Sequence, residues 1–370
     1  MRLTRAGLGA ALASLALLAA APATAGGQTA AAPTAATPAT SAVDRAAPEN
    51  APLRVLARRA GIRIGTAVDM SALNNDSTYR GLVAREFSTV TAENVMKWGP
   101  LEPQPGVYDW APADQLVDFA RRHGQTVRGH TLIWHNQLPE WLTSGTFTPA
   151  EFRQILRRHI FEVVGHFKGR IWHWDVANEV IDDNGQLRDT IFLRQLGPGY
   201  IADAFRWAHQ ADPRARLYLN DYNVEGINAK SDAYYALVQQ LRRAGVPVHG
   251  FGMQGHLATQ YGFPGDVLQN VRRFEALGLE TAFTEVDVRI LMPVDATDLQ
   301  AQAQGYNTLM QACLLARRCV SYTVWGFTDR YSWVPGVFPE EGAANLLDEN
   351  YQPKPAYDTI RNTLAIAGRR

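Results

Sequence analysis

The sequence predicts an α/β protein whose folded part is a single (β/α)8 barrel. Short apolar segments suited to strands occur eight times along the chain, and helix-like segments separate them. Several of these helices end on a glycine, as at Gly124, Gly245 and Gly278, which is the usual C-terminal stop. Strands and helices that alternate in this way over roughly 310 residues are typical of a (β/α)8 or TIM barrel.

The expected strands cover residues 62–69, 88–94, 126–134, 171–179, 216–223, 248–256, 280–288 and 319–327. The expected helices include residues 110–123, 149–167, 199–210, 230–244, 266–277 and 298–315. A doubly wound open sheet is the competing fold. It would need a glycine-rich phosphate-binding turn after its first strand, and no such turn follows Ile64, Gly65 and Thr66.

The first 52 residues are expected to lie outside the barrel. Arg2 and Arg5 precede an apolar run over residues 8–21 and the small residues 23–25, so residues 1–25 predict a signal peptide. The run is too short and too rich in alanine for a good transmembrane span. Residues 26–52 are mostly Ala, Thr and Pro, which predicts a disordered tether and leaves residues 53–370 as the folded domain. We therefore expect a secreted, extracellular protein.

The overall charge does not favour a polyanionic partner. The chain has 36 basic and 36 acidic residues, so nothing steers it toward nucleic acid or an anionic membrane, and we expect neither as a partner. A neutral polymer suits it better, and the protein is expected to be a monomer. Its nine Trp and thirteen Tyr are either core residues or platforms on which the C–H faces of sugars stack. Five indoles are interpreted as packing residues: Trp98, Trp110, Trp141, Trp172 and Trp207.

The two cysteines, Cys313 and Cys319, are close together in the sequence. In a secreted chain an oxidised pair that closes a small loop is the first expectation, and two free buried thiols are the alternative. A zinc site built from these two cysteines is improbable because no histidine is near them in the sequence.

Polar and aromatic residues gather at the C-terminal ends of the expected strands, where the chemistry of such barrels is located. These residues are Glu93, Asn94, His130, Trp134, Asn178, Glu179, Asn220, Tyr222, Gln254, His256, Glu285, Asp287 and Trp325. A purely structural barrel would more often carry ordinary turn residues at these places. One shared cleft is the better explanation.

Glu179 and Glu285 are the candidate catalytic pair. Residues 172–179 have the pattern of a buried strand that ends on Asn178 and Glu179, and burial of a carboxyl group favours its protonated form. Glu285 lies at the end of the seventh expected strand. If these strands face each other, the two acids can supply the proton donor and the carboxylate that glycosidic bond cleavage requires. A separation of about 5 Å implies retention of configuration, and a wider gap implies inversion. Alternatively, Asp175 and Glu179 are ion-paired structural carboxylates.

Several segments together resemble glycoside hydrolase family 10, whose members are mostly endo-β-1,4-xylanases. These segments are residues 93–98, 129–135, 174–179, 284–287 and 325–326. The resemblance covers nearly all of the chain after the tether, with no departure at the matching catalytic positions. It implies a retaining endo-β-1,4-xylanase that forms a covalent glycosyl-enzyme, with Glu179 as acid/base and Glu285 as nucleophile. The implied partners are xylan and xylo-oligosaccharides, and no cofactor is expected.

The resemblance also implies roles for residues around the two acids. Asn178 would hold the 2-hydroxyl of the sugar near the nucleophile, His256 would hydrogen-bond Glu285, and Gln254 would hydrogen-bond Glu179. Trp325 matches the indole beneath the reacting ring, and Tyr222 matches a platform on the leaving-group side. The non-reducing-side contacts implied are Glu93, Asn94, Lys97, His130, Trp134 and Trp333.

Other chemistries fit the sequence less well. His130 and His135 could suggest a metal site, but no histidine pair has the His-x-His spacing of metal-dependent barrel hydrolases, and no metal is expected. Ser144 and Ser332 lack the Gly-x-Ser-x-Gly context of a serine hydrolase. His173 is interpreted as a core residue. A β-1,4-glucanase remains the rival within the same chemistry, and a non-catalytic polysaccharide-binding barrel is the rival from another class.

Overall fold

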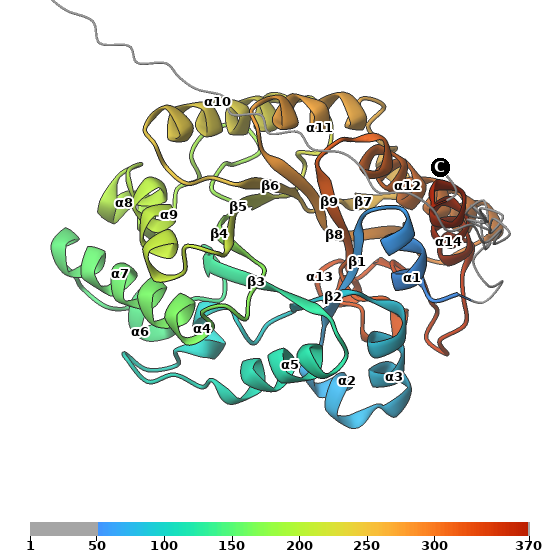
Figure 1. Ribbon diagram of the computed structural model, residues 1–370, viewed down its shortest axis with the longest axis horizontal. Helices are drawn as coiled ribbons and strands as arrows, with labels where there is room; N and C mark the ends of the chain where they lie inside the picture. The colour runs from blue at the N-terminus through green and yellow to red at the C-terminus, as the bar shows by residue number, and fades with distance from the viewer. Residues whose placement is uncertain (1–50, 369–370) are drawn as a thin grey trace, which may run out of the picture. The chain divides into compact units, whose positions relative to one another are not determined.

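A computed structural model of the protein describes residues 51–368. Its centre is a closed barrel of parallel strands, which confirms the predicted fold class (Figure 1). Neighbouring barrel strands pair in chain order, and the last strand pairs with both the first strand and its predecessor, so the ring closes. The barrel strands are β1 (Arg63–Val68), β2 (Thr89–Ala92), β3 (Thr126–Ile133), β4 (His173–Asn178), β5 (Arg216–Asp221), β6 (Gly250–Met253), β8 (Glu280–Leu291) and β9 (Cys319–Val324).

The expected sixth strand, residues 248–256, forms two short strands instead. β6 ends at Met253, and β7 (His256–Ala258) begins after Gly255, whose φ of 77° turns the chain. β7 pairs farther along β8, which is longer than expected and ends at Leu291. The other short strand, β10 (Glu341–Gly342), pairs antiparallel with the same extension of β8. This extension was not predicted because it lies beyond the barrel, where its partners are set by tertiary contacts.

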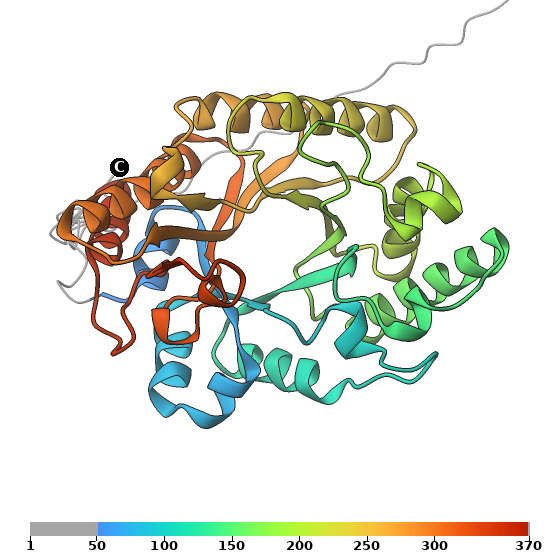
Figure 2. The same ribbon diagram turned by 180° about the vertical axis from the view of Figure 1, so that it is seen from behind.

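Helices surround the barrel (Figures 1 and 2). They are α1 (Leu53–Arg59), α2 (Met70–Asn75), α3 (Ser77–Glu86), α4 (Trp98–Leu101), α5 (Ala111–Arg122), α6 (Glu140–Thr143), α7 (Pro149–His166), α8 (Ile191–Leu196), α9 (Tyr200–Ala211), α10 (Ala229–Arg243), α11 (Val267–Ala276), α12 (Ala296–Leu315), α13 (Val334–Val337) and α14 (Pro355–Ala367), with 3-10 turns η1 (Thr259–Tyr261) and η2 (Asp329–Tyr331). Within residues 51–368, no helix has the length and apolar character needed to cross a membrane.

Local signals explain the main helix boundaries. Capping boxes start α7 at Thr148, α10 at Asn228 and α12 at Asp295, where side chains satisfy backbone N–H groups that have no partner inside the helix. Gly124 and Gly245 follow α5 and α10 with φ of 63° and 65°, a left-handed conformation that costs little without a Cβ atom. The short helices α2, α4, α6, α8 and α13 were not predicted, because helices of four to six residues carry too little periodicity to be recognised.

The predicted signal peptide and nearly all of the predicted tether, residues 1–50, lie outside the described residues. The last two residues of the predicted tether, Ala51 and Pro52, already belong to the folded domain. Ala51 is buried and its carbonyl accepts a hydrogen bond from Arg361 of α14. Pro52 then precedes the first turn of α1, and Leu53 is fully buried.

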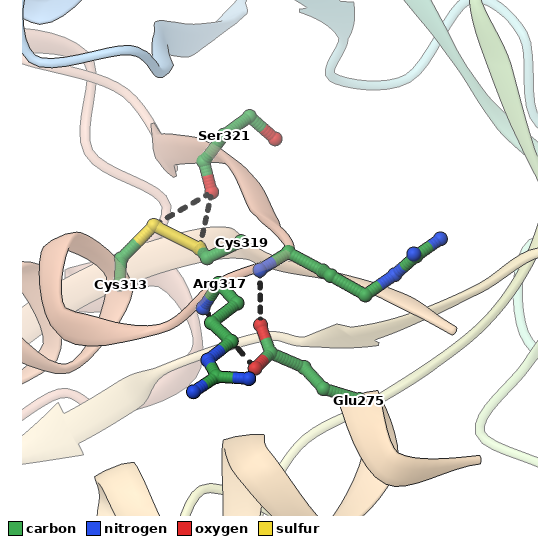
Figure 3. Close-up of a disulfide and its surroundings, with 6 residues drawn as sticks. Glu275, Cys313, Arg317, Cys319 and Ser321 are labelled. Carbon is green, nitrogen blue, oxygen red and sulfur yellow. Dashed lines mark hydrogen bonds between the residues drawn. A yellow bond between two sulfur atoms is a disulfide. The ribbon is translucent and has the colours of Figure 1, made fainter. Parts of the chain in front are cut away.

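Cys313 and Cys319 form a disulfide, as the sequence predicted (Figure 3). The bond joins the C-terminal turn of α12 to the first residue of β9, so it closes a loop entirely within one helix-to-strand connection. The same loop is held from a second side by Glu275 of α11, whose carboxylate accepts from the backbone N–H groups of Arg317 and Arg318. The disulfide is therefore structural, and it lies away from the C-terminal strand ends that form the barrel mouth.

Candidate active site

One cleft lies at the C-terminal ends of the barrel strands, with a cavity volume of about 620 Å³. Every residue that the sequence analysis assigned to catalysis or sugar binding lines this cleft. They are Glu93, Asn94, Lys97, His130, Trp134, Asn178, Glu179, Tyr222, Gln254, His256, Glu285, Trp325 and Trp333. His173 does not line it, because its ring is buried in the barrel and stacks on Tyr218 with centroids 4.1 Å apart.

Glu179 follows the last residue of β4 in a strained backbone conformation. Its φ of 56° is unusual for a residue with a side chain, and such strain is concentrated at functional sites. Its Oε1 accepts from Gln254 Nε2 at 3.1 Å and from Asn178 Nδ2 at 3.2 Å. Among the described residues, Oε2 has no hydrogen-bond donor, and the nearest ring nitrogen is His135 Nδ1 at 3.9 Å. Oε2 is therefore the oxygen that is free to carry and deliver a proton.

Glu285 lies on β8 and is surrounded by donors. Its Oε1 accepts from Asn220 Nδ2 at 2.8 Å and from Arg128 Nη2 at 3.2 Å, and its Oε2 lies 3.2 Å from His256 Nε2. Burial alone would raise the pKa of Glu285, but the charge of His130, the hydrogen bond from His256 and the Arg128 guanidinium hold that pKa well below its usual range. Glu285 is thus a buried anion, as a nucleophile must be.

A buried ion cluster supports Glu285 from the barrel interior. Arg128 of β3 donates to Asp175 of β4 as well as to Glu285, and His130 Nδ1 lies 2.8 Å from Asp175 Oδ2. Burial would raise the pKa of Asp175, but Arg128 and His130 lower it, so Asp175 is the ion-paired structural carboxylate of the alternative interpretation. Ligand atoms of His130, Asp175 and Glu285 lie within 4.8 Å of one another, a spacing that could hold a metal ion. Arg128 already supplies positive charge at this place.

His256 connects the nucleophile to a second carboxylate. Its Nδ1 lies 2.9 Å from Asp287 Oδ1, while Asp287 Oδ2 accepts from the indole Nε1 of Trp333 at 2.7 Å. Burial would lower the pKa of His256, but Asp287 and Glu285 raise it to about 10. The ring is therefore an imidazolium with both N–H groups donated to carboxylates. This fixes the orientation of His256 and of the Trp333 wall of the cleft.

Lys97 lies at the predicted non-reducing side of the cleft. Its ammonium donates to Asn94 Oδ1 at 3.0 Å and lies 4.8 Å from the Trp134 ring and 5.9 Å from the Trp325 ring. Burial lowers the pKa of Lys97, although Glu285 and Glu93 favour its charged form. Burial and the charge of Asp69 raise the pKa of Glu93 to about 7. The result is a small pocket with donors, acceptors and two indole walls, which suits a hydroxylated ring.

Tyr222 is assigned to the leaving-group side of the cleft, across Glu179 and Glu285 from Lys97. One face of its ring is already covered. The ammonium of Lys230 lies 3.5 Å from its ring centroid and forms an ion pair with buried Asp221 at 2.9 Å. Its hydroxyl accepts from Arg188 Nη2 at 3.1 Å, and Arg188 Nε donates to the carbonyl of Glu179. A ligand can therefore stack only on the uncovered face of Tyr222.

The sequence analysis placed Asn220 and Asp287 among the strand-end residues of the expected cleft without giving them a role, and it did not name Arg128. None of the three lines the cleft, but each contacts Glu285 or its partner His256. Asn220 Nδ2 also donates to Asn178 Oδ1 at 2.8 Å, and Thr284 Oγ1 donates to Asn220 Oδ1 at 2.6 Å. Asn220 thus links the ends of β4, β5 and β8. A signal was available: Arg128 lies two residues before His130 and Asp287 two residues after Glu285, so each pair lies on one face of its strand.

Replacing Asp287 with Asn is expected to lower the pKa of His256 from about 10 toward its ordinary value of 6.5. A group whose pKa is higher in the folded than in the unfolded protein stabilises the fold at pH values below its unfolded pKa. This stabilisation is lost as the pH rises through the folded pKa. The free energy of unfolding of the wild type therefore falls between pH 6.5 and about 10 by a component that Asp287→Asn lacks. Urea unfolding at about pH 6 and about pH 9 measures the difference.

The control for this experiment is Asp118→Asn, which makes the same chemical change at a carboxylate whose side chain is 52% exposed. It is expected to retain the wild-type dependence on pH. If Asp287→Asn also retained the wild-type fall in stability, Asp287 would not be what keeps His256 protonated.

Known proteins are similar in sequence to most of the chain. Residues 52–363 match the family model described as glycosyl hydrolase family 10. The chain is 43% identical over 311 residues to an endo-1,4-beta-xylanase of Agaricus bisporus, with 83% of this chain and 93% of that protein covered. It is 41% identical over 321 residues to endo-1,4-beta-xylanase B of Thermotoga neapolitana, with 85% and 92% covered.

A solved structure is also similar. Xylanase 10B from Thermotoga petrophila RKU-1 in complex with xylobiose matches with a TM-score of 0.84 and 42% sequence identity, with 87% of this chain and 99% of that chain covered. The predicted resemblance is thereby confirmed, and the chain belongs to glycosyl hydrolase family 10 and is a glycoside hydrolase.

Proposed function

We propose that this protein is a secreted, retaining endo-β-1,4-xylanase that cuts internal bonds of xylan. The observation that carries the proposal is the pair of acids in one cleft: Glu179 with a free oxygen, and Glu285 held as an anion. This division of roles is the one that retaining glycosidases require. The xylanase names of the relatives, and the xylobiose in the related structure, support the substrate class.

In the first step, the Glu285 carboxylate attacks the anomeric carbon while Glu179 Oε2 gives its proton to the leaving glycosidic oxygen. The carbon–oxygen bond to the leaving sugar breaks, and a glycosyl ester forms on Glu285. Gln254 and Asn178 hold Glu179 through its other oxygen, so the proton-carrying oxygen keeps its direction. Asn178 also lines the cleft, and its amide is proposed to contact a sugar hydroxyl beside the nucleophile.

In the second step, Glu179 is a carboxylate and takes a proton from water, which attacks the same carbon and releases Glu285. Esterified Glu285 no longer carries the charge that balances Arg128 and His256. These two cations favour the return of Glu285 to its anionic form, which is the leaving group of this step. Two displacements at one carbon give net retention.

The rival substrate is a β-1,4-glucan, whose sugar carries an exocyclic hydroxymethyl group that xylose lacks. On the predicted non-reducing side, the ammonium of Lys97 lies near two indole rings and donates to Asn94, so an exocyclic hydroxymethyl group would have to fit beside these side chains. We propose xylose as the sugar that this side accepts better. A non-catalytic polysaccharide-binding barrel would need neither a carboxyl oxygen that is free to donate a proton nor a buried carboxylate anion beside it.

Hydrolysis rates on xylan and on a soluble cellulose derivative test the substrate, and proton NMR of the xylan digest tests the mechanism. We expect faster hydrolysis of xylan, products of several lengths early in the digest, and β-anomers that appear before mutarotation. A faster rate on the cellulose derivative would replace xylan by glucan. Initial α-anomers would rule out the retaining mechanism.

The proposal of secretion rests on the sequence pattern of residues 1–25, and the disulfide supports it. Disulfides persist in oxidising compartments and are rare in a reducing cytosol. Residues 26–50, which are rich in Ala, Thr and Pro, are proposed to be a tether that precedes the catalytic domain. A monomer is proposed as the working unit, because both acids of the site come from one barrel.

A further inference from the structure

A second hollow of about 640 Å³ lies beside the catalytic cleft. Asn223, His256 and Arg289 line both, so the two lie side by side. Lys230 also lines the second hollow and covers one face of Tyr222. Because Tyr222 is assigned to the leaving-group side, the second hollow extends the cleft in the direction of the leaving-group sugars.

The charged groups of this hollow already have partners. Lys230 pairs with Asp183 at 3.0 Å and with Asp221 at 2.9 Å, and the carboxylate of Asp266 accepts from the backbone N–H of Ile227. Glu225 is buried and accepts from the backbone N–H of Gly255 at 2.8 Å. A hollow whose charges are balanced within the protein favours a neutral ligand over an ionic one.

Tyr261 forms part of the wall of this hollow and is 78% exposed. It ends η1, directly after β7, whose Leu257 pairs with Val288 of β8. On its other side, Gly262 turns the chain with a φ of 71°, and Phe263 packs against Gly305 of α12. The loop is therefore anchored on both sides of an aromatic ring that the fold itself does not bury.

We propose that Tyr261 is a sugar-binding platform for a distal xylose unit on the leaving-group side, and that it gives the enzyme a preference for long chains. This inference rests on the proposed function. The C–H face of a pyranose stacks on an exposed aromatic ring, and an amphipathic ring in a fixed loop loses little conformational entropy on binding.

The test compares Tyr261→Ala with Tyr261→Phe on two substrates. An aryl β-xylobioside places no sugar on the leaving-group side, whereas xylohexaose can extend into the second hollow. Tyr261→Ala is expected to lower kcat/KM on xylohexaose about two- to tenfold, the range for one aromatic contact, and to leave the aryl substrate unchanged. Tyr261→Phe keeps the ring and is expected to resemble the wild type on both.

Cleavage positions give an independent readout. With xylohexaose labelled by ¹⁸O at its reducing end, Tyr261→Ala is expected to shift cleavage toward that end, because fewer units are then held on the leaving-group side. Val107→Ala, at another exposed apolar residue outside both hollows, is the matched control.

Equal losses on both substrates would overturn the platform, because Tyr261 would then act through the neighbouring His256 loop. Unchanged rates and cleavage positions would overturn it as well. If the wild type failed to cut xylohexaose or xylan, the proposed function itself would fail. That result is distinguishable from a failure of the Tyr261 platform, because it is seen with the wild type and needs no variant.

Discussion

Replacing Glu285 with Ala is expected to abolish turnover of xylan and of aryl β-xylobiosides alike, with a loss of kcat of about 10⁵-fold or more. Both steps need this carboxylate, which is the attacking group in the first step and the leaving group in the second. No neighbouring group can replace it, because Arg128, Asn220 and His256 around it are donors to the anion. Steady-state kinetics on the two substrates measures the loss.

Azide tests the role of Glu285 more sharply than the loss of activity. In Glu285→Ala, azide can occupy the space of the missing carboxylate and attack an aryl xylobioside once, which gives the α-glycosyl azide with inverted configuration. Glu285→Gln fills the same space without a charge and is the matched control: it is expected to be equally inactive and not to be rescued. Rescue of Glu285→Gln, or a β-azide from Glu285→Ala, would contradict the assignment.

Replacing Glu179 with Ala is expected to separate the two steps. With xylan, the leaving oxygen needs a proton, so kcat/KM is expected to fall about 10³-fold, within the range for general acid catalysis. With a dinitrophenyl xylobioside, whose leaving group needs no proton, the first step is expected to be nearly unaffected. The second step still lacks its base, so the glycosyl-enzyme accumulates and a burst of dinitrophenol precedes a slow steady state.

Azide also distinguishes this variant from the first. In Glu179→Ala, azide attacks the glycosyl-enzyme in place of water without base assistance, so the expected product is the β-glycosyl azide, with retained configuration. Stopped-flow absorbance follows the burst, and NMR identifies the azide. If Glu179→Ala gave the α-azide and Glu285→Ala gave the β-azide, the roles of the two acids would be exchanged.

The supporting residues show why the cleft could be anticipated while its electrostatics could not. Glu179 and Glu285 stand out in the sequence because each is a carboxyl group at the end of an apolar strand. Arg128 is less conspicuous: in a single strand, an arginine between Val127 and Gly129 indicates a solvent-exposed position. Its full burial is possible only because β3, β4 and β8 bring Asp175 and Glu285 to it across the barrel interior.

His256 and Tyr261 show the same limit at the rim. The sequence predicts that His256 ends a strand, but its state as an imidazolium that donates to both Glu285 and Asp287 depends on the turn at Gly255 and on β7 pairing farther along β8. Tyr261 has no neighbouring motif that marks it. Its proposed role could be recognised only from the folded structure, because the hollow beside it has walls from four separate segments of the chain.

The sequence by itself determined the alternation of strands and helices, the acids and amides at the strand ends, and the proximity of the two cysteines. These are local properties, because apolar periodicity and the C-terminal ends of strands can be read from neighbouring residues. The tertiary structure alone decided which charges meet and which oxygen of Glu179 stays free. Those outcomes depend on partners such as Arg128 and Glu285, 157 positions apart, which only barrel closure places within hydrogen-bond distance.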